Sequence, residues 1–310
     1  MSRELDKMPI GKFSISNICM GERARLTEDE MEERNFRNNV STFLLMFKDY
    51  RWEMLFLREP DVLLKYSIII AFIVFVGILM VQGINRPSNT IFWIVNTIDG
   101  LILLSFVFIA WYKKVWIMIN PAPGINLDDD PEESSTDRKP KNVVSRFFYD
   151  LSDNVMRNIL ARGVIYLMTV ITLCLTSLLQ LTTCDEDEST GPQLCINPWA
   201  ITESLIMTIC MSFLFSRIPF LFKLLVGFII VCVYGYIVMY KYEFIFNQSV
   251  STNRNLKAEY SHMMVVILTF AIFHLIDRQS EYISKVDYTW KRQLQKKQED
   301  AEFTTKLSKF

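Results

Sequence analysis

Long apolar stretches separated by charged segments dominate the pattern of this chain. A helix needs about 20 mainly apolar residues to cross a hydrocarbon layer about 30 Å thick. Every backbone polar group in hydrocarbon must be paired internally, so such stretches are predicted to be helical. The six predicted spans are residues 62–82, 91–112, 164–181, 199–215, 218–240 and 261–276. The sequence therefore predicts an all-α, polytopic membrane protein with six transmembrane helices.

The last apolar stretch passes directly into a polar segment. Neither Gly nor Pro occurs from Ser261 to Phe310, so one helix is predicted to leave the membrane and continue as a stalk over residues 277–310. Its apolar positions recur every three or four residues, which places them on one helical face. These positions are Ile283, Val286, Trp290 and Leu294. We expect a partner helix to cover this face; the alternative is an interfacial helix lying on lipid headgroups.

The distribution of basic residues predicts the orientation. If the N-terminus is cytosolic, 29 of the 33 Lys and Arg residues fall in cytosolic segments or at cytosolic span ends, and 4 fall outside. Both termini are then cytosolic. Residues 1–61 are predicted to be a cytosolic tail or linker, residues 62–276 the membrane bundle and residues 277–310 the stalk. The first 40 residues lack the apolar core of a cleavable signal peptide.

Two outer loops carry candidate modification sites. Cys184 and Cys195 are predicted to face the oxidising side, where they could form a disulfide; the alternative is two free thiols near the interface. Asn247 begins the sequence Asn-Gln-Ser, which fits a glycosylation acceptor site.

Charged residues within the apolar stretches are costly in lipid and are therefore candidates for function. Asp99 is the deepest of them, and a hydrogen bond within the bundle is favoured over a cation or ligand site. Glu203 lies near an outer span end and could reach water, and Lys223 near an inner span end could extend to the interface.

Composition excludes several classes of function. The net charge is −1, and no basic face interleaved with aromatic residues suggests nucleic-acid binding. The sequence has no catalytic motif, no paired metal-ligand spacing, no arginine series of a voltage sensor and no potassium-channel filter. No catalytic residue, metal ligand or bound cofactor is predicted for this chain.

The start of the stalk resembles a known family. Asp277-Arg278-Gln279, followed by Asp287-Tyr288 and Trp290-Lys291, is similar to the exit from the second membrane bundle of animal membrane adenylyl cyclases. Lys285-Val286-Asp287-Tyr288 looks most like the type nine isoform. Further similarity lies at Arg58–Asp61, Ser216–Phe220, Leu256–His262 and Gln295–Ala301.

The resemblance implies a second membrane bundle and stalk at the plasma membrane. It implies as partners the first bundle and stalk of the same cyclase, membrane lipid, and a G-protein alpha subunit acting through cyclase domains that are not in this sequence. A complete cyclase would use Mg²⁺ or Mn²⁺ to convert ATP to cyclic AMP and pyrophosphate. The chain alone is then expected to be inactive. The alternative hypothesis is a non-enzymatic receptor-like or transport protein with Asp99 in its bundle.

Overall fold

In the part of the chain that the computed structural model describes, the secondary-structure elements are all helices, apart from an isolated β-bridge between Val40 and Phe47. It describes residues 40–41, 45–84, 90–120, 140, 142–179, 181, 197–247, 249 and 257–307. The helices are α3 (Tyr50–Arg58), α4 (Leu64–Ile84), α5 (Thr90–Ile119), α6 (Val143–Arg157), α7 (Ile159–Leu178), α8 (Pro198–Phe213), α9 (Phe220–Tyr236), α10 (Glu243–Asn247) and α11 (Ala258–Leu307), with a π-helical turn at Ile237–Lys241. The predicted all-α fold is confirmed.

Five helices are long and apolar enough to cross a membrane: α4, α5, α7, α9 with its π-helical turn, and α11. The sixth predicted span corresponds to α8, which has 16 residues and is shorter than the others. At 1.5 Å per residue, α8 is about 24 Å long, less than a hydrocarbon layer of about 30 Å. Of the six predicted spans, five therefore correspond to helices of spanning length, and the predicted span 199–215 corresponds to the shorter apolar helix α8.

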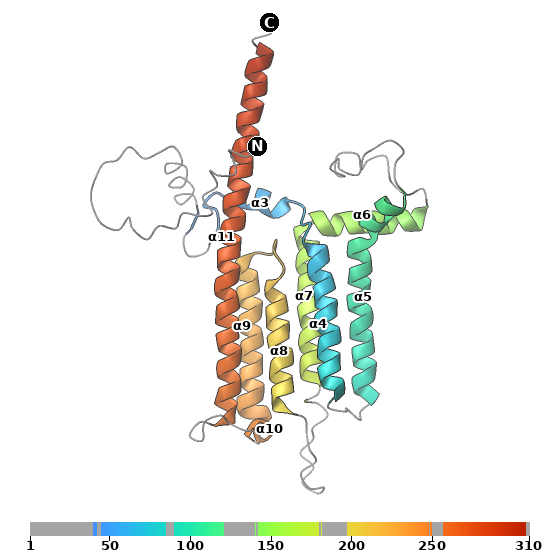
Figure 1. Cartoon of the computed structure of the whole chain (residues 1–310), viewed down its shortest axis with the longest axis vertical. Helices are drawn as coiled ribbons and strands as arrows, with labels where there is room; N and C mark the ends of the chain where they lie inside the picture. The colour runs from blue at the N-terminus through green and yellow to red at the C-terminus, as the bar shows by residue number, and fades with distance from the viewer. Residues whose placement is uncertain are drawn as a thin grey trace, which may run out of the picture.

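The short helix α8 nevertheless lies among the long ones. Figure 1 shows α8 roughly parallel to α4, α5, α7, α9 and α11, and α8 contacts α4, α7 and α11. Its interior surface is rich in small polar residues, of which Thr202, Ser204, Thr208 and Ser212 are buried. The hydroxyls of Ser177 on α7 and Thr208 are 3.1 Å apart and hydrogen-bonded. Small residues allow close helix approach in membranes, and their hydroxyls can bond between helices.

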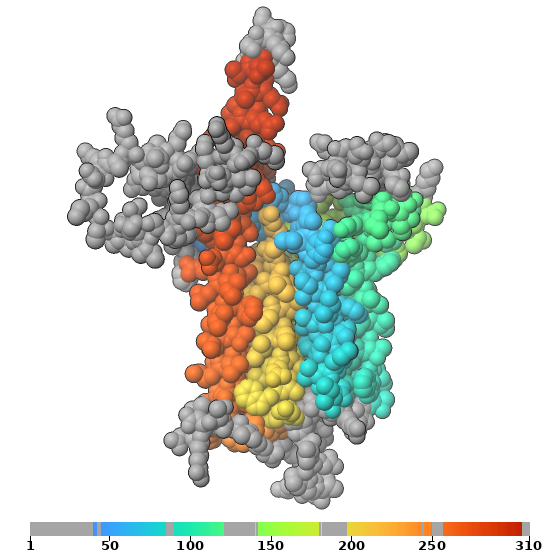
Figure 2. Space-filling model, viewed as in Figure 1, coloured from blue at the N-terminus to red at the C-terminus, as the bar shows by residue number. Residues whose placement is uncertain are grey.

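Helix α11 is unbroken from the bundle into the stalk, as the sequence predicts. Its 50 residues correspond to about 75 Å. Figure 2 shows its upper part extending beyond the bundle. We call the end of the bundle from which this part of α11 extends the stalk end. At this end α6 lies across the bundle, nearly perpendicular to the other helices (Figure 1).

The closest approach of a glycine on α9 to α11 is at Gly227. A Cβ atom at Gly227 would lie 2.5 Å from a ring carbon of Phe270 on α11. That ring already packs against Phe213 and His274, so it has little freedom to move. A Cβ atom at Gly77 on α4 would meet no atom within 4 Å.

We therefore expect Gly227→Ala to destabilise the bundle and Gly77→Ala to leave it unchanged or more stable. Overpacking costs about 1–3 kcal/mol, which exceeds the gain in helix propensity of about 1 kcal/mol. The measurement is the temperature at which half of the detergent-solubilised protein is lost from its monodisperse size-exclusion peak. Equal midpoints for the two variants would contradict the proposed contact.

Candidate functional site

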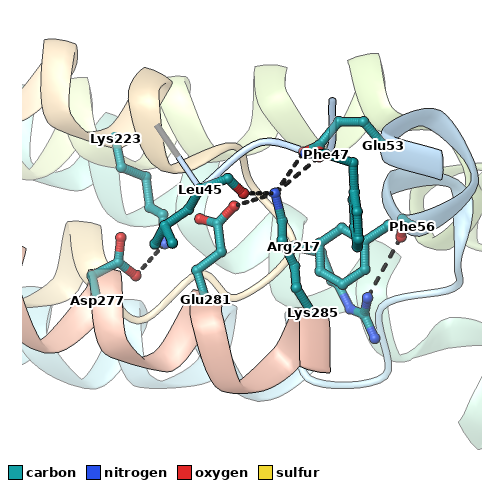
Figure 3. Close-up of polar contacts among 9 residues, drawn as sticks. All are labelled: Leu45, Phe47, Glu53, Phe56, Arg217, Lys223, Asp277, Glu281 and Lys285. Carbon is teal, nitrogen blue, oxygen red and sulfur yellow. Dashed lines mark hydrogen bonds and ion pairs between the residues drawn. The ribbon is translucent and has the colours of Figure 1, made fainter. Parts of the chain in front are cut away.

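A buried lysine on α11 joins the stalk to a segment far away in the sequence. The Lys285 side chain is only 1% exposed. Its Nζ lies 2.9 Å from both carboxylate oxygens of Glu53 on α3 and 3.2 Å from Oε1 of Glu281. It also donates to the carbonyl oxygen of Leu45 at 2.6 Å (Figure 3). These contacts neutralise and hydrogen-bond a charge that would otherwise be costly to bury.

The segment that receives Lys285 is folded by local hydrogen bonds. Asp49 caps α3 by accepting from the backbone N–H of Arg51 at 3.0 Å. Glu53 accepts from the backbone N–H of Phe47 at 3.0 Å. One carboxylate therefore binds both the backbone of its own segment and Lys285 of the stalk. Leu45 has a φ of 51°, a conformation that is uncommon for residues other than glycine. The carbonyl oxygen of this residue is the one that accepts from Lys285.

Aromatic rings enclose the same ammonium group. Lys285 Nζ lies 5.4 Å from the ring centroids of Phe47 and Phe56. Phe56 also packs edge-to-face on Tyr288, at 5.4 Å between centroids, and Tyr288 is 2% exposed. Rings at these distances attract a cation and exclude water from its ion pairs.

Two arginines fix the other end of this segment to the bundle. Arg162 on α7 donates to the carbonyl oxygens of Leu57 and Glu59. Arg217, in the turn between α8 and α9, pairs with Glu59 at 2.9 Å. We call residues 45–61 the strap, because it connects the stalk end of the bundle to the side of α11.

A second buried ion pair lies about two helical turns closer to the bundle. Lys223 on α9 pairs with Asp277 on α11, and the two side chains are 1% and 7% exposed. Lys223 also donates to the carbonyl oxygen of Phe215 at 3.1 Å. The prediction that Lys223 extends to the interface is therefore wrong, because a carboxylate is available within the protein.

The acidic and basic residues of α11 form a row at intervals of four. Asp277, Glu281 and Lys285 are all buried and lie on one face of the helix. Sequence reasoning concentrated on the apolar stripe and missed this row. The spacing was visible, but it did not show that Glu53, 232 positions away, would complete the pair.

The predicted apolar stripe lies on the opposite side of α11. Ile283 and Leu294 are 51% and 55% exposed, and Val286 and Trp290 are partly exposed. At 100° per residue, the centre of this stripe is about 180° from the centre of the Asp277–Lys285 row. The stalk thus has one face that packs against the strap and the bundle, and an opposite apolar face that is exposed or partly exposed among the described residues.

The predicted intramembrane carboxylates occupy different environments. Asp99 is buried on α5 and accepts from the Thr176 hydroxyl of α7 at 3.1 Å. Asn96, one turn away, is also buried, and its amide atoms have no hydrogen-bond partner in the described part of the chain. Glu203 is exposed on α8. The structure does not bring Glu203 together with Asp99 through any hydrogen bond or ion pair between described residues.

The predicted disulfide and glycosylation sites are not part of the stalk end. Cys184 and Cys195 fall outside the described residues. Asn247 is exposed at the end of α10, at the end of the bundle opposite the stalk (Figure 1). Nearby, the buried His262 ring is hydrogen-bonded through Nδ1 to Thr202 at 2.8 Å and through Nε2 to Ser249 at 3.0 Å.

The described residues do not fit the metal ions of a cyclase centre. Within the described ranges, no three His, Cys, Asp or Glu side chains converge as metal ligands. Asp277 is instead paired with Lys223, and Glu53 and Glu281 are paired with Lys285. No step of a reaction is therefore assigned to a metal on these residues.

Comparison with known proteins supports an adenylyl-cyclase-like family. No family model matches the chain. The chain is 26% identical to adenylyl cyclase X E of Drosophila melanogaster over 323 aligned residues, which cover 98% of this chain. The chain spans about 27% of the length of that relative. The similarity supports an adenylyl-cyclase-related membrane portion, and it does not support the closer resemblance to the type nine isoform.

We expect Lys285→Met to release the strap without unfolding the bundle. Removing one partner of a buried ion pair costs about 3–5 kcal/mol, because the carboxylates of Glu53 and Glu281 stay buried without their cation. Hydrogen–deuterium exchange should show lost protection in residues 45–58 while α7 and α8 remain protected.

The matched control is Lys291→Met, which removes an i,i+4 pair whose side chains are 69% and 57% exposed. Exposed pairs of this kind contribute about 0–1 kcal/mol, so the strap should stay protected. Adding Glu53→Gln to Lys285→Met should restore part of the protection, because one unpaired charge is removed. Loss of protection spread equally over the bundle would contradict a local role.

Proposed function

We propose that this chain is the second membrane bundle and stalk of an adenylyl cyclase and that it positions catalytic domains rather than performing chemistry. The observation that carries the proposal is the two-faced α11, one face bound by Lys223 and Glu53 and the other apolar and open. A helix fixed to a bundle on one side and apolar on the other is suited to hold a partner helix in one register. The similarity to adenylyl cyclase X E supports the same assignment.

In this proposal the stalk end faces the cytosol at the plasma membrane. The excess of Lys and Arg in the segments at this end supports that orientation. The disulfide of Cys184 with Cys195 and the glycan on Asn247 would then form outside. Mg²⁺ or Mn²⁺, ATP and the G-protein alpha subunit would bind the cyclase domains of the complete protein.

The partner proposed for the open face is the stalk of the first membrane bundle. Ile283, Val286, Trp290 and Leu294 occupy spacings of three and four residues, as in the seam of a coiled coil. The seam is short, so an isolated pair of such helices would be marginal. Attachment of both stalks to membrane bundles raises their effective concentration and so compensates for a weak seam.

The test uses the chain extended after Phe310 by a second cyclase domain and co-expressed with the complementary half of an adenylyl cyclase. We expect Trp290→Glu to lower cyclic AMP formation by about tenfold, because burying a large side chain contributes about 1.5–3 kcal/mol. The control is Gln295→Glu, which adds the same charge about 140° around the helix. Cyclic AMP formation and membrane expression are measured together.

Two outcomes would contradict the proposal. Equal cyclic AMP formation by Trp290→Glu and wild type would show that the apolar face does not position the domains. Cyclic AMP made by the purified 310-residue chain alone would show that the chain itself is catalytic.

The alternative function is a receptor or transporter that uses the bundle interior. The observation that favours it is the buried Asn96, whose amide atoms have no partner within the described residues, one turn from Asp99. Solute flux in liposomes that is lost in Asp99→Asn would favour this alternative over the proposed role in positioning catalytic domains.

A further inference from the structure

Two lysines at the stalk end of the bundle converge on the same pair of aromatic rings. Lys65 Nζ lies 5.3 Å from the Tyr66 centroid and 5.9 Å from the Trp111 centroid. Lys114 Nζ lies 5.9 Å and 5.0 Å from these two centroids. The rings pack edge-to-face at 5.7 Å, and Trp111 Nε1 donates to the backbone oxygen of Lys65 at 3.3 Å. Two helices, α4 and α5, thus present two ammonium groups around one aromatic platform.

The pair has no counter-charge of its own among the described residues. No carboxylate in the described ranges lies within ion-pair distance of Lys65 or Lys114. The neighbouring Lys113 differs, since its Nζ lies 2.7 Å from Asp153 on α6. Burial alone would raise the pKa of the Asp153 carboxyl, but Lys113 and Arg157 hold it below its ordinary value. The Asp153 carboxylate is therefore already paired with Lys113 and Arg157.

The platform lies at the depth where lipid headgroups are expected. Lys65 is in the first turn of α4 and Lys114 is near the stalk end of α5. Trp and Tyr are enriched at membrane–water interfaces, and Tyr66 is 43% exposed. Helix α6 crosses the bundle at the same end, with Val143, Val144 and Phe147 exposed, as in a helix lying in the interface (Figure 1).

We propose that Lys65 and Lys114 bind the phosphate of one anionic phospholipid in the leaflet at the stalk end. A phosphate between the two ammonium groups would relieve their mutual repulsion, and the acyl chains would extend along the apolar surfaces of α4 and α5. The Trp111 and Tyr66 rings would hold the lysine side chains at headgroup level. The proposal requires only that the chain spans a membrane, so it does not depend on the cyclase assignment.

The test is native mass spectrometry of the full chain released from detergent that contains equimolar phosphatidylserine and phosphatidylcholine. We expect wild type to retain one phosphatidylserine in preference to phosphatidylcholine. Lys65→Gln with Lys114→Gln should weaken this retention by about 25-fold, because each basic residue near an anionic surface strengthens the binding of anionic lipid by about fivefold. Lys65→Arg with Lys114→Arg should keep it.

The matched control is Lys296→Gln with Lys297→Gln, which removes the same charge from the distal stalk. Equal weakening in this control would replace a specific site by general charge attraction and overturn the proposal. Retention of phosphatidylcholine as strongly as phosphatidylserine would overturn it as well. Displacement of the lipid by millimolar inorganic phosphate would assign the site to free phosphate instead.

The single substitution Lys114→Gln tests the site in case the double variant does not fold. Lys114 is exposed, so Lys114→Gln should leave the size-exclusion profile and helical circular dichroism unchanged. It should weaken phosphatidylserine retention by about fivefold. Unchanged retention in this folded variant would contradict the proposed role of Lys114.

Discussion

The stalk junction depends on a buried charge that must have its partner with it. Lys285 is covered by the rings of Phe47 and Phe56 and pairs with Glu53, so its desolvation is offset only when the strap is docked. The strap in turn is held at the bundle by Arg162 and Arg217. Displacing α11 relative to the bundle would therefore separate two buried ion pairs at once, Lys223–Asp277 and Lys285–Glu53. This arrangement makes the position of the stalk a property of the whole stalk end.

The bundle itself is held by a different kind of contact. Apolar side chains are as stable against lipid tails as against another helix, so hydrophobicity does not determine which helices pack together. Close packing and hydrogen bonds between hydroxyl groups determine the helix neighbours instead. The short helix α8 illustrates this, because its Thr202 and Thr208 bond across to other helices. The glycine at position 227 allows the approach of α9 to α11 in the same way.

The bundle and the stalk end have different structural roles. The bundle fixes α11 in the membrane, and the ion pairs of Lys223 and Lys285 fix its rotation about its own axis. The direction of the apolar stripe at Trp290 follows from that rotation, since both faces belong to one unbroken helix. A stalk oriented in this way can set the register of a partner helix, and a lipid at Lys65 and Lys114 would tie the same end to the leaflet.

The membrane helices and the unbroken stalk could be predicted from the sequence, because they follow from local hydrophobicity and from the absence of Gly and Pro after Ser261. The sequence also identified the apolar stripe through its helical spacing. The covered face of α11, the inward direction of Lys223 and the shortness of α8 relative to the other spans became known from the folded structure. A buried charge is stabilised by a specific partner, and here Glu53 pairs with Lys285 from 232 residues away. Local periodicity contains no information about such a pair.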